Sequence, residues 1–433
     1  MSIELITVTL FGSLLVLLIL GIPVTFALGG LTVVFMFLLD GPAALYTVAT
    51  TTYQQITNTT LMTIPLFLIM GNFLVKSGIS EGMYKGLSYW LSEVRGGLAI
   101  VSIGVCVALA MCGGFGPGIL TMGLVAVPAM LKHNYSKSAA LGSVMAGGVL
   151  GEIIPPAIIM IIFAFIGRIS IGKLFFGGMV PGFLLAFMYI AYIILLGILK
   201  PESLPKIKEE VTWGMRFAAL REIFLPAMLV VLVLGSIFLG IATPTEAAGV
   251  GALGAMMICA LHGKLTVGVV RESCMETLKI TGMALWILIP ATLFGVFYSS
   301  AGAQDMLMDF IDSLEVSRWV VLICMQLILM IFGMFMDDYA VVTICAPIML
   351  PIAQMLGFDP IWFSILFILN MQIAYLSPPF GWALIMMKGV APASISTKDI
   401  WRSVPPFLLM QFLMLVVVML FPELATWLPN KVF

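Results

Sequence analysis

Apolar runs long enough to cross a bilayer follow one another along almost the whole chain, and they restrict its fold more than any other feature. About 20 apolar residues cross the hydrocarbon core as a helix. Runs of this kind occupy residues 4–20, 22–39, 61–76, 137–167, 173–199, 223–241, 244–262, 281–299, 361–388 and 402–424. Charged residues make up only 9% of the chain, whereas soluble domains carry about 25%. The sequence therefore predicts an all-α polytopic membrane protein.

The composition also limits the kinds of partner and bound group that we expect for this chain. The net charge of −1 leaves no basic stripe, so the lipid bilayer is an expected partner and nucleic acid is not. The chain has only two histidines, and its six cysteines show no CxxC spacing. We therefore expect neither a histidine-based metal or catalytic centre nor a bound cofactor.

Two further apolar stretches, 97–131 and 319–356, are interrupted near their middle by small or charged residues. Each can be two full spans or one re-entrant hairpin that enters and leaves by the same side. The loop 200–221 carries five basic residues, which places it in the cytoplasm because Lys and Arg concentrate there. Both alternatives put the N-terminus outside. The first apolar run is predicted to be a membrane helix and not a signal peptide, because no basic residues precede it.

The chain resembles itself at an offset of about 223 residues. Four proline-bearing blocks recur at this offset or within two residues of it: Pro23 with Pro244, Pro128 with Pro351, Pro155-Pro156 with Pro378-Pro379, and Pro181 with Pro405. With hairpins, each half holds five crossings, and an odd number of crossings inverts the second half relative to the first. Inverted repeats with discontinuous helices are the architecture of secondary transporters.

This repeat divides the chain into a first unit, residues 1–200, a cytoplasmic linker, 201–221, and a second unit, 222–433. Each unit is predicted to contain a hairpin followed by a broken helix. The hairpin and broken helix cover 97–131 and 137–167 in the first unit, and 319–356 and 361–388 in the second.

The proline pairs fall in the middle of the two broken helices. Each pair removes two backbone donors and releases carbonyls of the preceding turn, which cost several kcal/mol in hydrocarbon unless something satisfies them. A simple kink, with the carbonyls met by neighbouring helices, is one explanation. The matched position of the two breaks favours the other, in which freed carbonyls bind Na⁺ and half-helix N-termini face an anionic substrate.

Several residues near the breaks are further substrate or coupling candidates. Gly113 and Gly114 would let the first hairpin tip approach another backbone, unless they serve only tight helix packing. Asp337 and Asp338 at the second tip are functional candidates in apolar surroundings, unless the tip reaches water. Glu152 is a candidate carboxylate for proton or cation coupling. By contrast, Thr243-Pro-Thr-Glu246 has the form of a helix capping box, so Glu246 is predicted to be structural.

Specific strings make the chain resemble the large membrane subunit of TRAP (tripartite ATP-independent periplasmic) transporters, the DctM-like family, over essentially its whole length. They are Gly151 to Pro156 with the Gly-x-x-x-Pro-Pro break, Ser170 to Phe175 followed by Pro181-Gly182, Ala242 to Ala248, Gly333 to Asp337 followed by Pro347 and Pro351, and Asn370 to Gly381.

The resemblance implies an elevator-type, Na⁺-coupled importer in a bacterial inner membrane. Its partners would be a small four-helix membrane subunit and a periplasmic binding protein that delivers a small organic acid. Two sodium sites, built mostly from main-chain oxygens, would be expected. The first would use Cys112, Phe115, Gly151, Ile154 and Pro156, and the second Gly333, Ala374, Ser377 and Phe380.

The sequence departs from the family pattern at three places in these sites. The first tip reads Cys112-Gly-Gly-Phe115, where the family usually has Ser-Gly-Ser-Ser, and so lacks hydroxyl ligands. Ala374 stands where Gly is usual, and Glu152 is an additional carboxylate. Glu152 could replace a missing ligand or make the coupling partly proton-dependent.

Two other functions compete with this interpretation. A stand-alone Na⁺- or H⁺-coupled dicarboxylate or ion carrier would use the same repeat without a binding protein. An intramembrane aspartyl protease needs two aspartates that converge from separate helices, but Asp337 and Asp338 are adjacent. No Arg lies within an apolar run to hold a substrate carboxylate, and Arg168, at the outer end of its span, is the nearest candidate.

Overall fold

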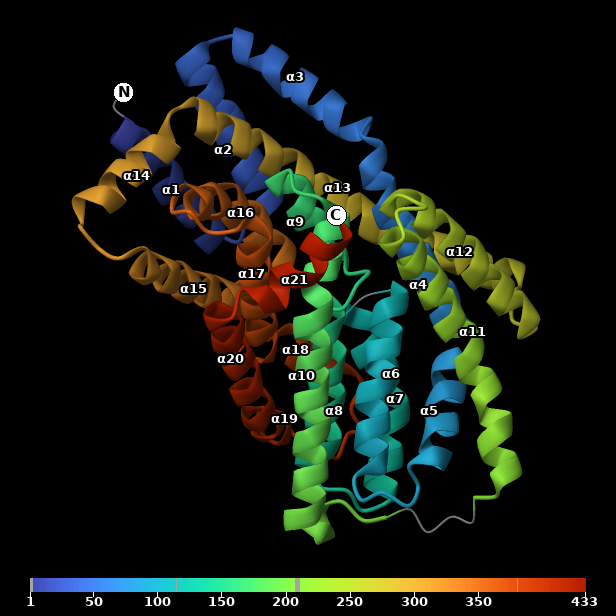
Figure 1. The fold of residues 1–433 in the computed structure, drawn as a ribbon. Helices are drawn as coiled ribbons and strands as arrows, with labels where there is room; N and C mark the ends of the chain where they lie inside the picture. Colours follow the sequence, from blue (N-terminus) through green and yellow to red (C-terminus); the bar gives the residue numbers. More distant parts are fainter. Residues whose placement is uncertain (1–2, 114, 207–210, 380) are drawn as a thin grey trace.

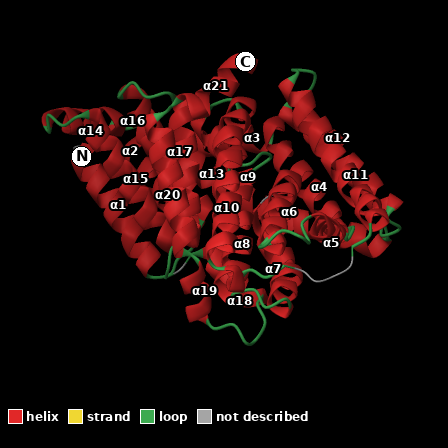
Figure 2. Ribbon diagram, turned by 60° about the horizontal axis from the view of Figure 1, so that its bottom comes forward, coloured by secondary structure: helices red, strands yellow, loops and turns green. Residues whose placement is uncertain are grey.

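The computed structural model describes residues 3–113, 115–206, 211–379 and 381–433, and over these residues it is built of helices and loops without a strand (Figure 2). The all-α prediction is therefore confirmed. Eight of the described helices are long and apolar enough to cross a membrane. The protein is thus a multi-pass membrane protein.

The first half of the chain holds ten α-helices and two 3-10 turns among its described residues. They are α1 (Ile3–Ile19), α2 (Val24–Asp40), α3 (Ala43–Ile56), η1 (Thr59–Met62), α4 (Thr63–Lys76), α5 (Ile79–Trp90), α6 (Gly97–Gly113), α7 (Phe115–Lys132), α8 (Lys137–Val149), η2 (Leu150–Glu152), α9 (Ile158–Gly167) and α10 (Ile171–Leu199).

The second half follows after the turn η3 (Pro201–Ser203). Its helices are α11 (Trp213–Phe238), α12 (Pro244–Leu261), α13 (Val267–Ser300), α14 (Ala303–Ser313), α15 (Arg318–Phe335), α16 (Asp338–Met355), α17 (Pro360–Leu376), α18 (Trp382–Val390), α19 (Thr397–Ser403), α20 (Pro405–Leu420) and α21 (Glu423–Val432). The starts of α7 and α16, at 115 and 338, differ by 223, as do the starts of α8 and α17, at 137 and 360.

Packing sorts the helices into two groups that differ from the two sequence halves (Figure 1). The outer group contains α1–α5 and α11–α14, in which α12 packs on α4, α11 on α5 and α13 on α2. The inner group contains α6–α10 and α15–α21, in which α8 packs on α6 and α7, α17 on α15, and α9 on α16. Each group therefore combines elements from both halves, and they meet mainly where α4 and α5 contact α6 and where α13 contacts α16.

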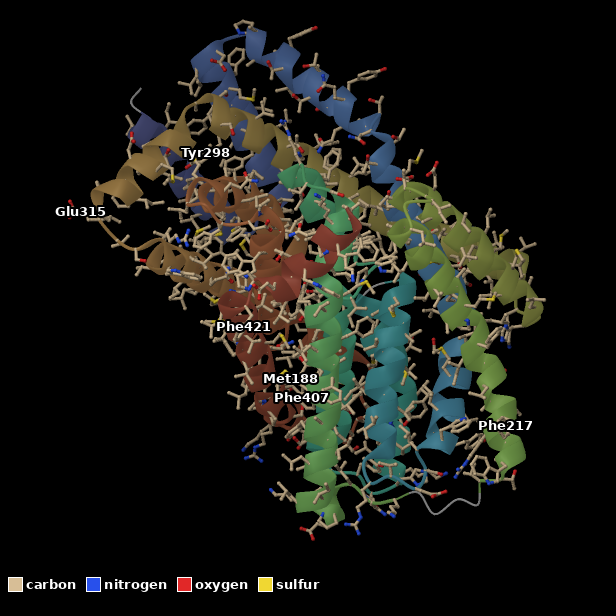
Figure 3. All side chains as sticks on the ribbon, in the orientation of Figure 1. Met188, Phe217, Tyr298, Glu315, Phe407 and Phe421 are labelled. Atoms are coloured by element: carbon tan, nitrogen blue, oxygen red, sulfur yellow. The ribbon has the colours of Figure 1, made fainter. Side chains whose placement is uncertain are left out.

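Large apolar side chains cover much of the outer surface, as a lipid-facing protein requires. Phe217 on α11 and Phe421 after α20 are 61% and 56% exposed, and Phe217 lies at the edge of the molecule (Figure 3). Inside, Phe407 is buried and packs edge-on against Tyr189 and Tyr192, which joins α20 to α10.

The two halves differ most where α3 and α4 correspond to the single helix α13. The Asn58 side chain accepts a hydrogen bond from the Thr60 amide at 2.9 Å. Such local side-chain bonds compete with the helical ladder, and they separate α3 from α4. The α13 helix instead runs for 34 residues without interruption, well beyond the predicted span 281–299. Similarly, α11 begins at Trp213, inside the predicted linker 201–221.

The predicted capping box at the start of α12 is confirmed. The Thr243 hydroxyl accepts from the Glu246 amide, and the Glu246 carboxylate accepts from the Thr243 amide at 2.8 Å. Glu246 therefore stabilises the helix start, as predicted from the sequence.

Candidate functional site

The first candidate site lies at the break between α8 and α9. The proline pair Pro155-Pro156 cannot donate backbone hydrogen bonds, so the helix ends in the turn η2 and restarts at Ile158. Gly151, Ile154 and Pro156, three predicted sodium ligands, are all buried at this break.

The second candidate site has the same construction between α17 and α18. The helix ends at Leu376, and Ser377 closes it by donating from its amide to Ala374 O at 3.1 Å. The Ser377 hydroxyl donates to Ile373 O at 2.7 Å, and Ser377 is 7% exposed. In both breaks the Pro-Pro peptide bond is cis.

A hydrogen bond joins the two breaks directly. The Gln372 Nε2 atom on α17 donates to Val149 O, the last residue of α8, at 2.9 Å. These two residues are 223 positions apart, the offset of the sequence repeat. Sequence reasoning missed Gln372, although a Gln in an apolar helix at the repeat equivalent of a helix end was the available signal.

Two residues of the predicted second sodium site lie close together on neighbouring helices. A Cβ added to Gly333 on α15 would lie 2.6 Å from the Cβ of Ala374 on α17, so the two helices approach as closely as a glycine allows. The structure therefore brings together Gly333 and Ala374, as the family resemblance implied.

Carboxyl groups from both halves meet beside the breaks. Glu152 of η2 is 2% exposed, and neither of its oxygens has a hydrogen-bond partner of ordinary geometry among the described residues. It lies within electrostatic range of the half-buried Asp338 at the start of α16, and the Tyr375 hydroxyl faces both carboxyls. Glu152 is therefore buried close to Asp338, a proximity that the sequence did not indicate, and its role in coupling stays a prediction.

Asp337 has a structural explanation. Its Oδ1 accepts from the Ala340 amide at 2.9 Å and caps α16. Asp337 and Asp338 start one and the same helix, which is not the paired geometry that an aspartyl protease needs.

The helices that restart after the breaks begin without a side-chain cap. α9 follows Ala157 and α18 follows Gly381. By contrast, α8, α16 and α17 are capped by Ser136, Asp337 and Asp359. Uncapped amides and the helix dipole favour a negative group at these two starts.

Arg168 lies apart from the breaks. It follows the last residue of α9 and is exposed at a cavity of about 900 Å³ between α3, α9, α13 and α16. None of the break residues lines that cavity. Of the other predicted site residues, Gly114 and Phe380 lie outside the described residues, and Cys112, Gly113 and Phe115 are described only in their backbone.

We expect Gln372→Leu to destabilise the protein, because the buried Val149 O loses the one side-chain donor that it has among the described residues. An unsatisfied buried carbonyl costs about 1–3 kcal/mol. Thermal unfolding of the detergent-solubilised variant measures the loss. Gln354→Leu, at an exposed glutamine on α16, is the matched control, and its unfolding temperature should be close to that of the parent. If both variants unfold at the same temperature, the bond from Gln372 to Val149 does not stabilise the protein.

Comparison with known proteins identifies the family. Residues 11–424 match the family described as "Tripartite ATP-independent periplasmic transporter, DctM component". The C4-dicarboxylate TRAP transporter large permease protein DctM of Rhodobacter capsulatus is 30% identical, over 97% of this chain and 98% of that protein. The isethionate TRAP transporter permease protein DctMQ of Oleidesulfovibrio alaskensis is 29% identical over 96% of this chain but 65% of its own longer length.

The fold has a solved counterpart. The structure of the Alcanivorax borkumensis YdaH transporter matches with a TM-score of 0.65 over 94% of this chain and 97% of its own. That crystal structure has been described as revealing an unusual topology. Its sequence identity is 14%, so the likeness concerns the fold alone. The family match and the DctM relative show that the chain belongs to the DctM family of TRAP transporter large permeases and is a transporter and not an enzyme.

Proposed function

We propose that the chain is the transport subunit of a sodium-coupled importer of a small organic acid in a bacterial inner membrane. A small four-helix membrane subunit and a periplasmic binding protein that delivers the solute complete the system, in line with the tripartite family. The relative named DctMQ, which extends well beyond the matched length, supports a close association with the small subunit.

The observation that carries this proposal is the pair of matched helix breaks joined by the bond from Gln372 to Val149. Oppositely oriented half-helices that meet near the bilayer midplane present carbonyls to cations and N-termini to anions. The packing supports an elevator mechanism, because both breaks and both predicted hairpins lie in the inner group of helices. In this mechanism the inner group moves as a rigid body against the outer group. The N-terminus lies on the periplasmic side of the membrane.

The test is uptake into proteoliposomes that contain this chain with its small subunit. Thermal-shift screening of the binding protein against organic acids first supplies the solute. We expect uptake to fall at least tenfold when the binding protein is omitted or when K⁺ replaces Na⁺ outside. Undiminished uptake without the binding protein would instead favour a stand-alone carrier, and uptake indifferent to Na⁺ would contradict the sodium sites.

A further inference from the structure

The cavity at Arg168 is polar in an otherwise apolar protein. Its walls include hydroxyl and amide side chains from three helices: Thr51, Gln54, Thr292, Ser300 and Gln354. α3 and α13 belong to the outer group of helices, whereas α9 and α16 belong to the inner group. The cavity therefore lies where the two groups face each other, on the side of the molecule that also carries the start of α12.

Arg168 is the sole charged residue among those that line this cavity. No described carboxylate forms an ion pair with it. Its backbone is left-handed, with φ 52°, and it closes α9 through the Ile169 amide, which donates to Ala164 O at 3.0 Å. Glycine is the usual residue at this position of a helix end. An arginine held here in place of glycine presents an unneutralised positive charge to the cavity.

Gln55 forms part of the cavity wall and fixes α3 against α13 there. It is 4% exposed and lines the same cavity. Its Nε2 donates to Leu288 O at 2.9 Å and to the Thr292 hydroxyl, which fixes the orientation of the amide. Its Oε1 is buried without a hydrogen-bond partner among the described residues. Because this oxygen has almost no accessible surface, the polar groups that a ligand in the cavity can reach are the other hydroxyl and amide side chains of the wall.

We propose that this cavity is a vestibule that binds an organic anion with a single acidic group and several hydroxyls. Arg168 pairs with the acidic group, and the hydroxyl and amide side chains of the wall, such as Thr51 and Gln354, bind the polar remainder of the solute. One positive charge balances one carboxylate or sulfonate, whereas a dicarboxylate would leave its second charge without a partner. Naming this ligand as the transported solute rests on the proposed function.

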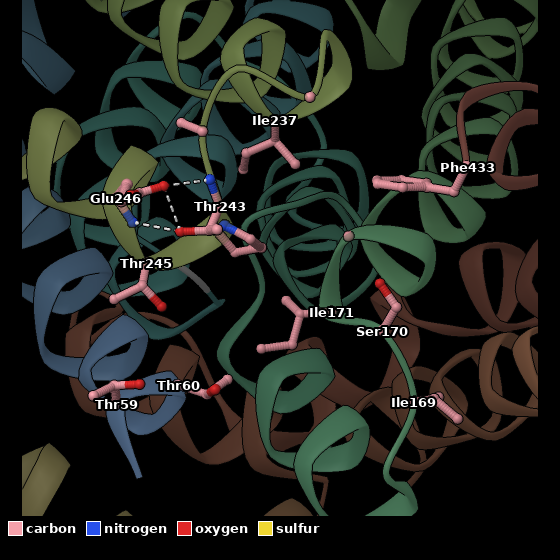
Figure 4. Close-up of a pocket in the computed structure, with 14 residues that line it drawn as sticks. Thr59, Thr60, Ile169, Ser170, Ile171, Ile237, Thr243, Thr245, Glu246 and Phe433 are labelled. Carbon is pink, nitrogen blue, oxygen red and sulfur yellow. Dashed lines mark hydrogen bonds between the residues drawn. The ribbon is translucent and has the colours of Figure 1, made fainter.

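The neighbouring cavity has no positively charged side chain among the described residues that line it. It has a volume of about 720 Å³ and shares Thr60, Ile169 and Ile171 with the vestibule (Figure 4). Its one charged lining residue is Glu246, which the capping box already uses (Figure 4). A negative charge beside the vestibule disfavours anions there, so the binding place of the anion is the Arg168 end.

Cysteine labelling tests the vestibule without knowledge of the solute. The reporter is Gln354→Cys in a chain whose exposed Cys274 and Cys324 are replaced by serine, with the rate of the reporter-free chain subtracted. We compare methanethiosulfonate reagents that carry a sulfonate or a trimethylammonium group. With Arg168 present, we expect the ratio of anionic to cationic labelling rates to be about fivefold higher than with Arg168→Asn. Asparagine is the neutral choice because it tolerates the left-handed backbone.

Two controls keep the result interpretable. Arg168→Lys retains the charge and should keep the ratio high, and a Ser313→Cys reporter at the exposed end of α14 should not respond to Arg168→Asn. Gluconate, with one carboxylate and several hydroxyls, should slow labelling at residue 354 more than succinate or uncharged sorbitol, and Arg168→Asn should abolish this protection.

The inference is overturned if the labelling ratio is the same with Arg168→Asn, or if sorbitol protects as well as gluconate. Neither result bears on sodium-coupled uptake, which the proteoliposome assay measures separately. Conversely, failure of binding-protein-dependent uptake alongside charge-selective labelling would leave the vestibule standing and remove the proposed importer.

Discussion

Gly333→Ala should abolish most of the sodium response and transport of this protein, and Ala374→Gly should restore both. The new Cβ at position 333 would lie 2.6 Å from the Cβ of Ala374, whereas carbon atoms in contact are about 3.5–4.0 Å apart. α15 and α17 must therefore separate. Because Ala374 O closes the helix at Ser377, this separation displaces the second break itself.

The expected magnitude follows from overpacking and from misplacement of ligands. Overpacking a close helix contact costs about 1–3 kcal/mol of stability. A shift of about 1 Å at a positioned group can cost on the order of 100-fold in rate. We therefore expect a lower Tm, loss of the Na⁺-induced rise in Tm, and uptake reduced at least tenfold.

The rescue distinguishes a local clash from general damage. Removing the Ala374 methyl in the double variant restores the space between the helices. The double variant should therefore lose less stability than the sum of the losses of the two single variants, a coupling seen for residues in contact. Gly235→Ala on α11 is the matched control, because nothing lies within 4 Å of an added Cβ there, and it should unfold near the parent. A double variant as impaired as Gly333→Ala would contradict the mechanism.

Local chemistry made the interrupted elements predictable. Proline cannot continue a helix, so both breaks fall where the proline pairs predicted, between α8 and α9 and between α17 and α18. The interrupted stretches 97–131 and 319–356 each form two helices, as predicted. Whether these pairs are re-entrant hairpins, and whether the two halves are inverted in the membrane, remain predictions.

Tertiary packing determined the features that the sequence did not reveal. The proximity of Glu152 to Asp338 brings a turn of the first half near a helix start of the second, and no periodicity in the sequence indicates it. The vestibule at Arg168 is likewise assembled from segments up to some 300 positions apart, residues 51 to 354. The capping role of Asp337 could have been predicted, since an Asp directly before a helix is a common N-cap.

The sequence repeat also did not predict the asymmetry between the two halves. The Asn58 turn separates α3 from α4, whereas 223 positions later the chain has Thr281 within the unbroken helix α13. The outer group therefore contains two helices from the first half, which are separated at the Asn58 side-chain bond, and one long helix from the second half.

Glu152→Gln should stabilise the protein in K⁺ medium and weaken its response to Na⁺. Glu152 is 2% exposed, its oxygens lack ordinary hydrogen bonds, and the Asp338 carboxyl lies in range. Two neighbouring carboxylates in low dielectric repel each other unless a cation lies between them. Glutamine keeps the shape of the side chain and removes its charge, so the variant loses both the repulsion and the attraction for a cation.

The measurement is Tm as a function of Na⁺ concentration for the detergent-solubilised protein. Relief of the buried charge by about 1–3 kcal/mol should raise Tm in K⁺ by about 2 °C or more. A ligand that binds the folded state raises stability with its concentration. Loss of one favourable charge should move the half-saturating Na⁺ concentration about tenfold upward, which corresponds to about 1.4 kcal/mol.

Asp338→Asn provides the partner arm of the experiment. Because the two carboxyls share one environment, the effects of Glu152→Gln and Asp338→Asn should be less than additive in the double variant. Glu81→Gln, at an exposed carboxylate on α5, is the matched control and should leave the Na⁺ curve in place. Superimposable Na⁺ curves for Glu152→Gln and the parent, together with unchanged pH profiles of uptake, would remove Glu152 from the coupling site and leave the cation to the main-chain oxygens of the two breaks.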